Sequence, residues 1–307
     1  MPRTHPHPTD HAIHAALHEH GLPPPPWTPL GSGVWGDVFD LHDGSVLKLV
    51  CHSGGIGSGL QILDGETAAL QAAAGLRPPI AAARLIAGAK INPTTDGMGD
   101  YCGWIRMSKL AGRTAMNILA GPIDSAKKVA IMRRLGEAAA LLHTKTRDLP
   151  AGQGPMPPVS QDRLLQIADI VPDMRSACLE VAAILADGPQ HPFLHGDING
   201  GNVLFADEQE FAHSNVGMVD WGEAQSGPVE IELRHMNDIG GPADAMIEGY
   251  ASVSDTSLDP TRLNAALSMN ALGTLAIATL GTVAGLDPSE ARRVALSRLE
   301  AIDRAGS

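Results

Sequence analysis

Residues 195–202 read His-Gly-Asp-Ile-Asn-Gly-Gly-Asn and lead directly into the apolar run Val203-Leu204-Phe205. Further along the chain, a second apolar run ends in Val219-Asp220-Trp221. The two segments place two aspartates and an asparagine beside short strands. An Asp-x4-Asn spacing is common by itself. Here the spacing is combined with a preceding His-Gly, a strand that follows, and the Val-Asp-Trp segment at this distance. A chance occurrence of the whole pattern is improbable.

These acidic and amide side chains are the ones that phosphoryl transfer requires. One carboxylate must orient the attacking hydroxyl or take its proton, and Asp197 fits this role. Two oxygen ligands must hold Mg²⁺ against the nucleotide phosphates, and Asn202 and Asp220 fit that role. We therefore expect a catalytic Asp197, the metal ligands Asn202 and Asp220, and ATP or GTP with Mg²⁺ as cofactors.

A glycine-rich segment near the N-terminus has the spacing of a phosphate cradle. Gly31, Gly33 and Gly36 form G-x-G-x-x-G, a weak signal alone in a chain with 34 glycines. In a dinucleotide-binding fold this motif opens a helix, whereas here His42-Asp43-Gly44 predicts a hairpin into a second strand. Ser32 at the tip could hydrogen-bond a phosphate, and its turn preference explains it equally well.

The second strand, Val46–Val50, carries Lys48 at its centre. A lysine among apolar strand residues is costly unless it meets an anion; the alternative is an edge-strand lysine that points to solvent. Glu66 lies on the helix that we expect from Gly65 to Ala74, where it could pair with Lys48 or be an ordinary first-turn glutamate. A Walker-type site is not supported, because GxxxxGK[ST] does not occur.

The overall pattern divides the chain into three parts. We expect residues 1–27 to form an N-terminal helix, from Thr9 or Asp10 to about Glu19, and a Pro-rich lead-in. Residues 28–111 are strand-rich with one helix, and residues 112–307 are larger and mainly helical. Further expected elements are a Gly/Ser-rich loop over 51–60 whose cluster Gly54–Gly59 is a connector, strands near Ala83–Ile86 and Gly103–Met107, a helix over Ala126–His143, a linker at Pro150–Pro158, one or two helices within Leu164–Leu185, and a hairpin at about Ala206–Asn215.

Composition limits the partners and the location. The formal net charge of −12 argues against nucleic acid and anionic membranes as partners. A cationic substrate fits this charge, as does a simple contribution to solubility. The three cysteines are scattered and odd in number, which suits a reducing cytoplasm. Polar residues interrupt the apolar stretch Leu263–Leu286, so we expect a buried helix or helix pair there rather than a membrane span.

Taken together, these residues resemble the aminoglycoside phosphotransferase and choline-kinase-like families, within the protein-kinase fold. The glycines, the lysine, the glutamate and the three acidic-site residues occur in the family's order over roughly residues 28–235. In Met107–Thr114, which looks like the lobe connection, the backbone of Ser108 and Leu110 would meet the adenine. The resemblance implies an α+β, bilobal protein-kinase-like fold, with a small antiparallel-sheet N-lobe carrying one helix and a larger, mainly helical C-lobe.

The same resemblance implies an ATP-dependent O-phosphotransferase that acts on a small-molecule hydroxyl. An aminoglycoside-type antibiotic is the first expected acceptor, which would make antibiotic resistance the biological role. A kinase of a sugar or a choline-like amino alcohol fits the same motifs, and so does a catalytically inactive nucleotide-binding regulator. Acids that could receive cationic groups of the acceptor, each also readable as a solvated surface charge, are Glu223, Glu232, Asp238, Asp244 and Glu248.

Departures from protein kinases favour a small-molecule acceptor. The catalytic loop has His195-Gly196-Asp197 in place of His-Arg-Asp, and the metal aspartate begins Asp220-Trp221-Gly222 in place of Asp-Phe-Gly. In this family the histidine is mostly a packing and hydrogen-bonding residue, which is the role expected of His195. The segment Gly227–Glu232 departs from the family's Gly-Asp-Pro…Asp-Leu-Ala run, so either Glu230 or Glu232 could be the structural acid.

Overall fold

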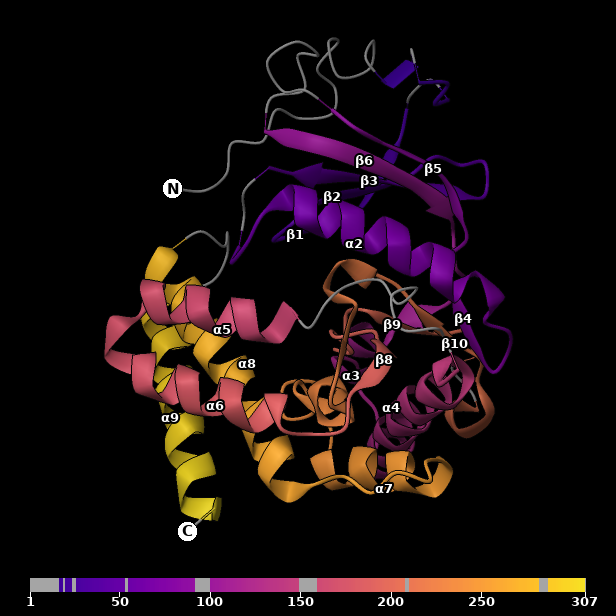
Figure 1. Ribbon diagram of the computed structural model, residues 1–307. Helices are drawn as coiled ribbons and strands as arrows, with labels where there is room; N and C mark the ends of the chain where they lie inside the picture. Colours follow the sequence, from indigo (N-terminus) through magenta and orange to yellow (C-terminus); the bar gives the residue numbers. More distant parts are fainter. Residues whose placement is uncertain are drawn as a thin grey trace.

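The computed structural model describes residues 17–18, 20–23, 26–52, 55–91, 100–148, 159–207, 210–281 and 287–306. A sheet with one long helix forms one end of the molecule, and a larger assembly of helices forms the other (Figure 1). This arrangement confirms the expected α+β, bilobal fold. Most of the helix expected from Thr9 or Asp10 and the linker Pro150–Pro158 lie outside the described residues.

The N-terminal lobe is built on a five-stranded sheet in which all neighbouring strands are antiparallel. Gly33 lies opposite Gly36 where the first two strands meet, so the glycine-rich motif forms a hairpin and opens no helix. The expected strand–hairpin–strand arrangement is therefore confirmed. In spatial order the strands are β1 (Thr28–Gly33), β2 (Gly36–Asp40), β3 (Ser45–Cys51), β6 (Tyr101–Ser108) and β5 (Leu85–Lys90).

Strand β3 is buried on both faces, which explains its unbroken apolar sequence around Lys48. Val46 and Val50 pack into the cluster that includes helix α2 (Gly59–Ala72), whereas Leu47 and Leu49 pack into a cluster on the opposite face. Since side chains alternate along a strand, Lys48 lies on the same face as Val46 and Val50. The lysine is thereby directed toward α2 and not toward solvent.

Helix α2 begins at Gly59, so the predicted start at Gly65 is wrong. A Cβ on Gly59 would lie 1.8 Å from the backbone oxygen of Cys51. Glycine therefore allows the first turn to pack directly against the end of β3. The buried side chains of Ile62 and Leu63, which precede the predicted start, continue this contact.

The strand expected near Ala83–Ile86 is confirmed only in its second half, because Leu85 and Ile86 begin a strand whereas residues 83 and 84 form a short break between two strands. Strand β4 (Ile80–Ala82) precedes the break, and β5 follows it. Strand β4 runs parallel to β10 (Val216–Met218) in a second sheet of order β4-β10-β9-β7, with β7 at Arg113–Thr114 and β9 at Val203–Phe205. The predicted division into two lobes at residue 111 stays a prediction. Strand β4 lies before residue 111 and pairs with β10, which lies after it. The expected hairpin between β9 and β10 is confirmed.

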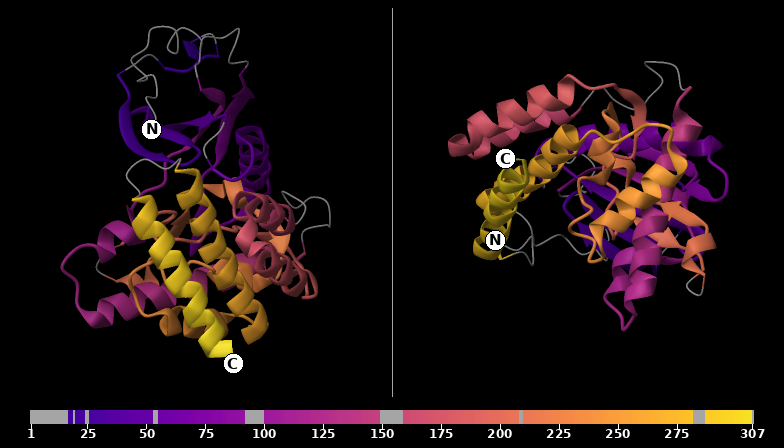
Figure 2. Two further views of the ribbon diagram at one scale, coloured as in Figure 1. Left: turned by 90° about the vertical axis from the view of Figure 1, so that its left-hand side faces the viewer. Right: turned by 90° about the horizontal axis from the view of Figure 1, so that it is seen from below.

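The C-terminal lobe consists of helices around these short strands (Figure 2). The helix expected over Ala126–His143 is observed, and the region Leu164–Leu185 holds two helices separated at Pro172. Asp124 and Asp259 cap two long helices by accepting backbone N–H groups. The helices are α3 (Ala115–Leu119), α4 (Ser125–Thr146), α5 (Val159–Ile170), α6 (Arg175–Ala186), α7 (Ala243–Val253), α8 (Pro260–Leu280) and α9 (Pro288–Gly306), and a further strand pair joins β8 (His191–Leu194) to β11 (Gln225–Gly227).

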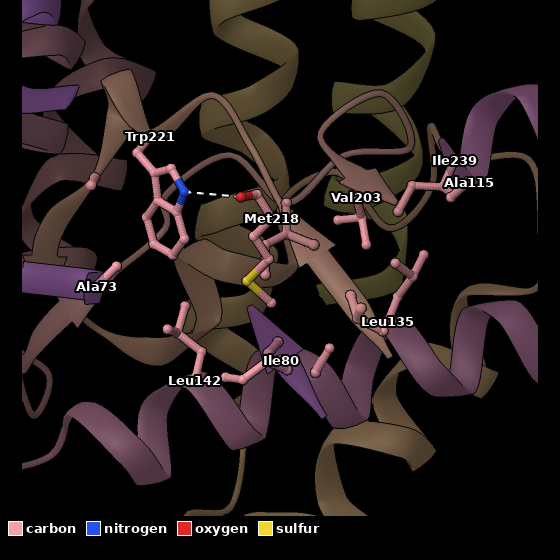
Figure 3. Packing of buried hydrophobic residues seen from close by; sticks show 14 of the residues in the cluster. Ala73, Ile80, Ala115, Leu135, Leu142, Val203, Met218, Trp221 and Ile239 are labelled. Carbon is pink, nitrogen blue, oxygen red and sulfur yellow. Dashed lines mark hydrogen bonds between the residues drawn. The ribbon is translucent and has the colours of Figure 1, made fainter. Parts of the chain in front are cut away.

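Trp221 anchors the segment after Asp220 in the hydrophobic core (Figure 3). Its side chain is fully buried, and its indole N–H donates to the backbone oxygen of Met218 at 3.1 Å. Leu142 and Ile80 belong to the same cluster. Packing of this large side chain fixes where β10 ends and therefore where Asp220 emerges.

Helix α8 is, among the described residues, the one helix long and apolar enough to cross a membrane by length and composition. In its most apolar window 44% of the residues are buried. Ala266, Leu272 and Ala276 of this helix pack in a cluster with residues of α5 and α6. The helix is therefore a structural part of the C-terminal lobe.

Candidate active site

A cavity of about 420 Å³ lies between the two lobes. Its walls come from the glycine-rich hairpin, β3, the segment that follows β8, helix α5 and helix α8. The cavity brings together the following residues that the sequence predicted for the site: Gly33, Gly36, Lys48, Asp197, Asn202 and Asp220. Gly55 and Ile56 of the predicted connector also line it.

Lys48 makes two short ion pairs at the inner end of the cavity. Its Nζ donates to Glu66 Oε2 at 2.6 Å and to Asp220 Oδ1 at 2.6 Å. Burial by itself would lower the pKa of Lys48, but Asp220 and Glu66 outweigh burial and raise it. The expected pairing of Lys48 with Glu66 is confirmed, and the lysine is a fixed cation.

Glu66 is completely buried behind this lysine. Burial raises its pKa, while the charge of Lys48 acts in the opposite direction. Its second oxygen, Oε1, is buried and has no hydrogen-bond partner among the described residues. The glutamate therefore holds Lys48 in position from behind, on the side of α2, and does not itself line the cavity.

Both carboxylate oxygens of Asp197 have partners. Asn202 Nδ2 donates to Oδ2 at 2.8 Å, and His235 Nε2 lies 2.8 Å from Oδ1. Arg234 Nη2 lies 3.5 Å from the same Oδ1. Burial alone would raise the pKa of Asp197, but the hydrogen bond and charge of His235, and then the charge of Arg234, hold it well below its usual value. Asp197 is therefore an ionised, rigidly oriented carboxylate.

Asn202 and Asp220 offer the kind of oxygen atoms that Mg²⁺ prefers. Because Asn202 uses its Nδ2 on Asp197, its Oδ1 remains as the ligand atom. The Asp220 side chain is 46% exposed, and its backbone has φ 62° in the left-handed region. Such a conformation is costly for a residue other than glycine and concentrates at functional sites. The two side chains fit a Mg²⁺ ion that takes its other ligands from nucleotide phosphates.

No cluster of three or more His, Cys, Asp or Glu side chains suited to a metal occurs in the part of the chain that the structure describes. Mg²⁺ in phosphotransfer sites is usually held by one or two carboxylates together with substrate phosphates, and does not need such a cluster. A metal site formed by Asn202 and Asp220 is thus compatible with the side chains present.

The three motif glycines differ in how much space a side chain would have at each position. A Cβ on Gly36 would lie 1.8 Å from the backbone oxygen of Leu49, so the sheet itself requires glycine there. A Cβ on Gly31 or Gly33 would meet no protein atom within 4 Å. Internal packing explains neither glycine. For Gly33, which lines the cavity, a ligand that approaches the backbone closely would explain the glycine.

Glu232 anchors the catalytic loop from below. Its two carboxylate oxygens accept the backbone N–H groups of His195 and Gly196, each at 2.8 Å. His143 at the end of α4 lies 3.2 Å from the same carboxylate. Burial would raise the pKa of Glu232, but His143 and His195 lower it. Of the two acids proposed from the sequence, Glu232 holds the loop, whereas Glu230 accepts the backbone N–H of Asp259.

Gly196 could not be an arginine in this backbone. Its φ is 77°, and a Cβ would lie 2.2 Å from the backbone oxygen of Glu223. His195 packs on Trp221 with 4.4 Å between ring centroids, and its Nε2 lies 3.0 Å from the backbone oxygen of Val219. The histidine thus packs and hydrogen-bonds beneath the loop, as expected.

The sequence model of the phosphotransferase enzyme family, APH, matches residues 26–263. The chain belongs to this family. Among curated proteins, none matches the sequence of this phosphotransferase.

Solved structures similar to this phosphotransferase are described with different small molecules in their names. The GDP and kanamycin complex of APH(2")-IIIa has a TM-score of 0.65 at 13% identity, over 95% of this chain and 100% of the other. The microcompartment-associated aminopropanol kinase has a TM-score of 0.59 at 12% identity, over 91% of each chain. A choline/ethanolamine kinase family protein from Mesorhizobium loti has a TM-score of 0.57 at 16% identity, over 91% of this chain and 88% of the other. At these identities the likeness shows the kinase-like fold alone.

Some predicted site residues of the phosphotransferase lie outside the cavity lining. Gly31 and Ser32 are exposed on β1, at the outer side of the hairpin. Ser108 ends β6, where its backbone N–H and hydroxyl oxygen both bond to the backbone of Arg84. Leu110 packs against the main core cluster. The proposed contacts of Ser108 and Leu110 with adenine stay predictions.

The acids expected to meet a cationic acceptor have different environments. Only Glu223 and Asp238 line the cavity, and both are paired with cations of the phosphotransferase itself. Glu232 is buried under the loop, and Glu248 forms an exposed ion pair with Arg133. Asp244 lies in the first turn of α7, outside the cavity lining.

Sequence reasoning missed three cationic residues that line the cavity: Arg163, Arg234 and His235. Arg163 lies on α5 and pairs with Glu223, and the other two follow the 3₁₀ turn Val229–Leu233. Their sequence surroundings carry no motif of their own. The one available signal was the position of Arg234-His235 directly after the segment that departs from the family pattern.

Proposed function

We propose that this protein transfers the γ-phosphate of ATP to a hydroxyl group of a small molecule. The observation that carries this proposal is the convergence of three groups in one cavity. These are the hairpin glycines Gly33 and Gly36, the Lys48–Asp220 pair, and the Asp197–Asn202 pair. Every position that the chemistry requires is intact, which favours an enzyme over an inactive nucleotide-binding regulator.

In the proposed reaction each residue has a defined role. Lys48 binds the α- and β-phosphates under the hairpin, and Glu66 keeps it in place. Asn202 and Asp220 would hold Mg²⁺, which supplies charge neutralisation on the phosphates. Asp197 orients the acceptor hydroxyl and takes its proton as the hydroxyl oxygen bonds to the γ-phosphorus and the bond to the β-phosphate oxygen breaks. Catalysis then comes mainly from positioning and charge.

Nucleotide choice and location are part of the same proposal. ATP is proposed as the donor and GTP as the alternative, since similar folds are described in complexes with ATP and with GDP. The side chains of Cys51, Cys102 and Cys178 are all buried, which fits the reducing cytoplasm that we propose as the location.

Two classes of acceptor are consistent with the proposed site. An aminoglycoside-type acceptor is supported by the likeness to folds described with kanamycin and streptomycin, and by the net charge of −12. A small-metabolite acceptor is favoured by the cavity itself, because its acceptor-side acids Glu223 and Asp238 already have cationic partners. We place the small-metabolite class first on this ground. A marked preference for aminoglycosides would instead make antibiotic resistance the role.

The test is ADP release by the purified protein with aminoglycosides, macrolides, choline-like alcohols and sugars. Phosphotransfer should disappear when Mg²⁺ is chelated. Asp197→Asn should lower turnover by about 10²–10⁴-fold, while nucleotide affinity stays close to that of the wild type. Asp255→Asn, at a side chain that is 92% exposed, is the matched control and should change neither value. Wild-type turnover in Asp197→Asn would show that the assignment is wrong.

A further inference from the structure

The half of the cavity beyond Asp197 is rich in buried cations. It is bounded by helix α5, by the segment after the 3₁₀ turn Val229–Leu233, and by helix α8. The side chains of Arg163 and Arg234 are only 16% and 7% exposed, yet both line the cavity. A guanidinium exposed to water is solvated by water, whereas a cation that is this deeply buried needs an anionic partner.

The compensation within the protein is incomplete. Arg163 Nη1 pairs with Glu223 Oε2, and Arg234 Nη2 lies 3.7 Å from the same oxygen. Two guanidiniums therefore share one carboxylate. Arg234 Nε also donates to His235 Nε2 at 3.0 Å, but the two side chains together carry more N–H donors than these acceptors can take. Arg234 also lies 3.5 Å from Asp197, but that carboxylate is already hydrogen-bonded by Asn202 and His235.

His235 and Asp238 do not reverse this balance. Asp238 Oδ2 lies 3.7 Å from His235 Nδ1, and its other oxygen pairs with Arg298. Asn270 Nδ2 donates to Oδ2 as well, at 2.7 Å. Burial would lower the pKa of His235, but its hydrogen bond to Asp197 raises it. Asp238 is thus paired with Arg298, which does not line the cavity, and Asp197 and Glu223 are the acids next to Arg163, Arg234 and His235.

We propose that this half of the cavity is a subsite for an anionic group, a carboxylate or a phosphate, on the hydroxyl-bearing acceptor. The two guanidiniums would bind that group in the bidentate manner that suits planar oxyanions. This inference rests on the proposed function and names its substrate class. An anionic group has the same sign as the overall charge of −12. The subsite can still bind it, because charges at short range within a cavity outweigh the screened field of the distant surface.

The geometry limits the form of the acceptor. Arg234 Nη2 and Asp197 Oδ1 are 3.5 Å apart, so the anionic group and the reacting hydroxyl must lie within a few bonds of each other. The opposite wall, on α8, is formed by Met269, Gly273 and Ile277. A Cβ on Gly273 would meet no atom within 4 Å, which leaves room beside a wall that also carries the polar side chains of Asn270 and Thr274. A compact hydroxy acid or sugar acid matches these features better than a polyamine.

The test compares three ring compounds that differ in charge: glucuronate, glucose and glucosamine. Their dissociation constants are measured by calorimetry on the Mg²⁺-nucleotide-saturated protein, and their phosphorylation is measured by ADP release. We expect glucuronate to bind at least about tenfold more tightly than glucosamine, as is typical when a charged hydrogen bond is gained. Equal binding of the two, including no binding of either, or tighter binding of glucosamine overturns the proposal.

Three variants assign the effect to the cation pair. Arg163→Gln should weaken glucuronate binding by about tenfold and leave glucose unchanged. Glu223→Gln removes the shared carboxylate and should strengthen glucuronate binding, a gain that loss of folding cannot produce. Arg133→Gln, at an exposed ion pair with Glu248, is the control and should have no effect. If Arg163→Gln lowers kcat equally for every acceptor without changing their affinities, the guanidinium serves the transferred phosphate and the subsite is refuted.

The two proposals fail in different ways. Absence of Mg²⁺-dependent phosphotransfer to any acceptor, with the preference for glucuronate intact, would refute the proposed function alone. Phosphotransfer with a preference for cationic acceptors would refute the anionic subsite alone.

Discussion

His235 Nε2 lies 2.8 Å from Asp197 Oδ1, so the proposed catalytic carboxylate is in direct contact with a histidine 38 positions further along the chain (235 − 197). Each residue stabilises the charged form of the other against the effect of burial: the pKa of His235 is raised and that of Asp197 is lowered. The histidine therefore occupies one oxygen of the proposed catalytic carboxylate. We infer that it is a positioning residue for Asp197.

Replacement of His235 should change how stability depends on pH. A raised pKa in the folded state means that the pair stabilises the protein at low pH and that this contribution is lost as pH rises through the folded-state pKa. We expect His235→Asn to be less stable than the wild type by about 1–3 kcal/mol near pH 6, with a smaller difference at pH 9. Urea unfolding at both pH values measures this, with His213→Asn at an exposed histidine as control. A difference that grows with pH would contradict the assignment.

Gly33→Ala separates nucleotide binding from folding. Because no protein atom lies within 4 Å of a Cβ at this position, the unfolding free energy should change by no more than about 0.5 kcal/mol. The methyl group would project where phosphates approach the hairpin, and we expect the KM for nucleotide to rise about tenfold. Gly75→Ala, also without near atoms but outside the cavity, should leave the KM unchanged. An unaltered KM in Gly33→Ala would argue against the cradle.

Gly196→Ala should be much more damaging than an alanine at another left-handed glycine. Gly196 has φ 77° and a Cβ there would lie 2.2 Å from the backbone oxygen of Glu223. Gly240 has φ 93° and open space around its Cβ. The strain common to both should cost about 1–2 kcal/mol, and the clash should add further destabilisation and loss of turnover in Gly196→Ala only. Thermal or urea unfolding of the two variants decides, and equal costs would mean that the loop can shift freely.

Glu232→Ala tests the anchor of the catalytic loop. The change leaves the N–H groups of His195 and Gly196 without their acceptor and His143 without its acid, all within the core. We expect a loss of about 3–5 kcal/mol in unfolding free energy, measured with urea. Glu248→Ala breaks an exposed ion pair and should cost no more than about 1 kcal/mol. Similar losses in both variants would show that the loop does not depend on Glu232.

The acidic site was predictable from short sequence motifs, and its residues Asp197, Asn202 and Asp220 do line one cavity. Asp197 and Asn202 are five residues apart, and the hydrogen bond between their side chains forms within one loop. Lys48 was placed correctly because strand alternation and the glycine hairpin fix its side-chain direction. The start of helix α2 was misplaced because Gly59 suggested a loop, whereas glycine is needed there for close contact with β3.

The sequence by itself determined the order and types of the groups that can handle a phosphate, since hairpins, glycine motifs and short catalytic loops are specified by neighbouring residues. Only the tertiary structure decided which acids are free and which are paired. Glu230 and Glu232 differ by two positions on one 3₁₀ turn, and the choice between them depends on which faces the catalytic loop. Arg163 and Glu223 meet from distant parts of the chain. Electrostatic interactions act through space and not along the sequence, so the charge of the acceptor subsite appears only when the chain is folded.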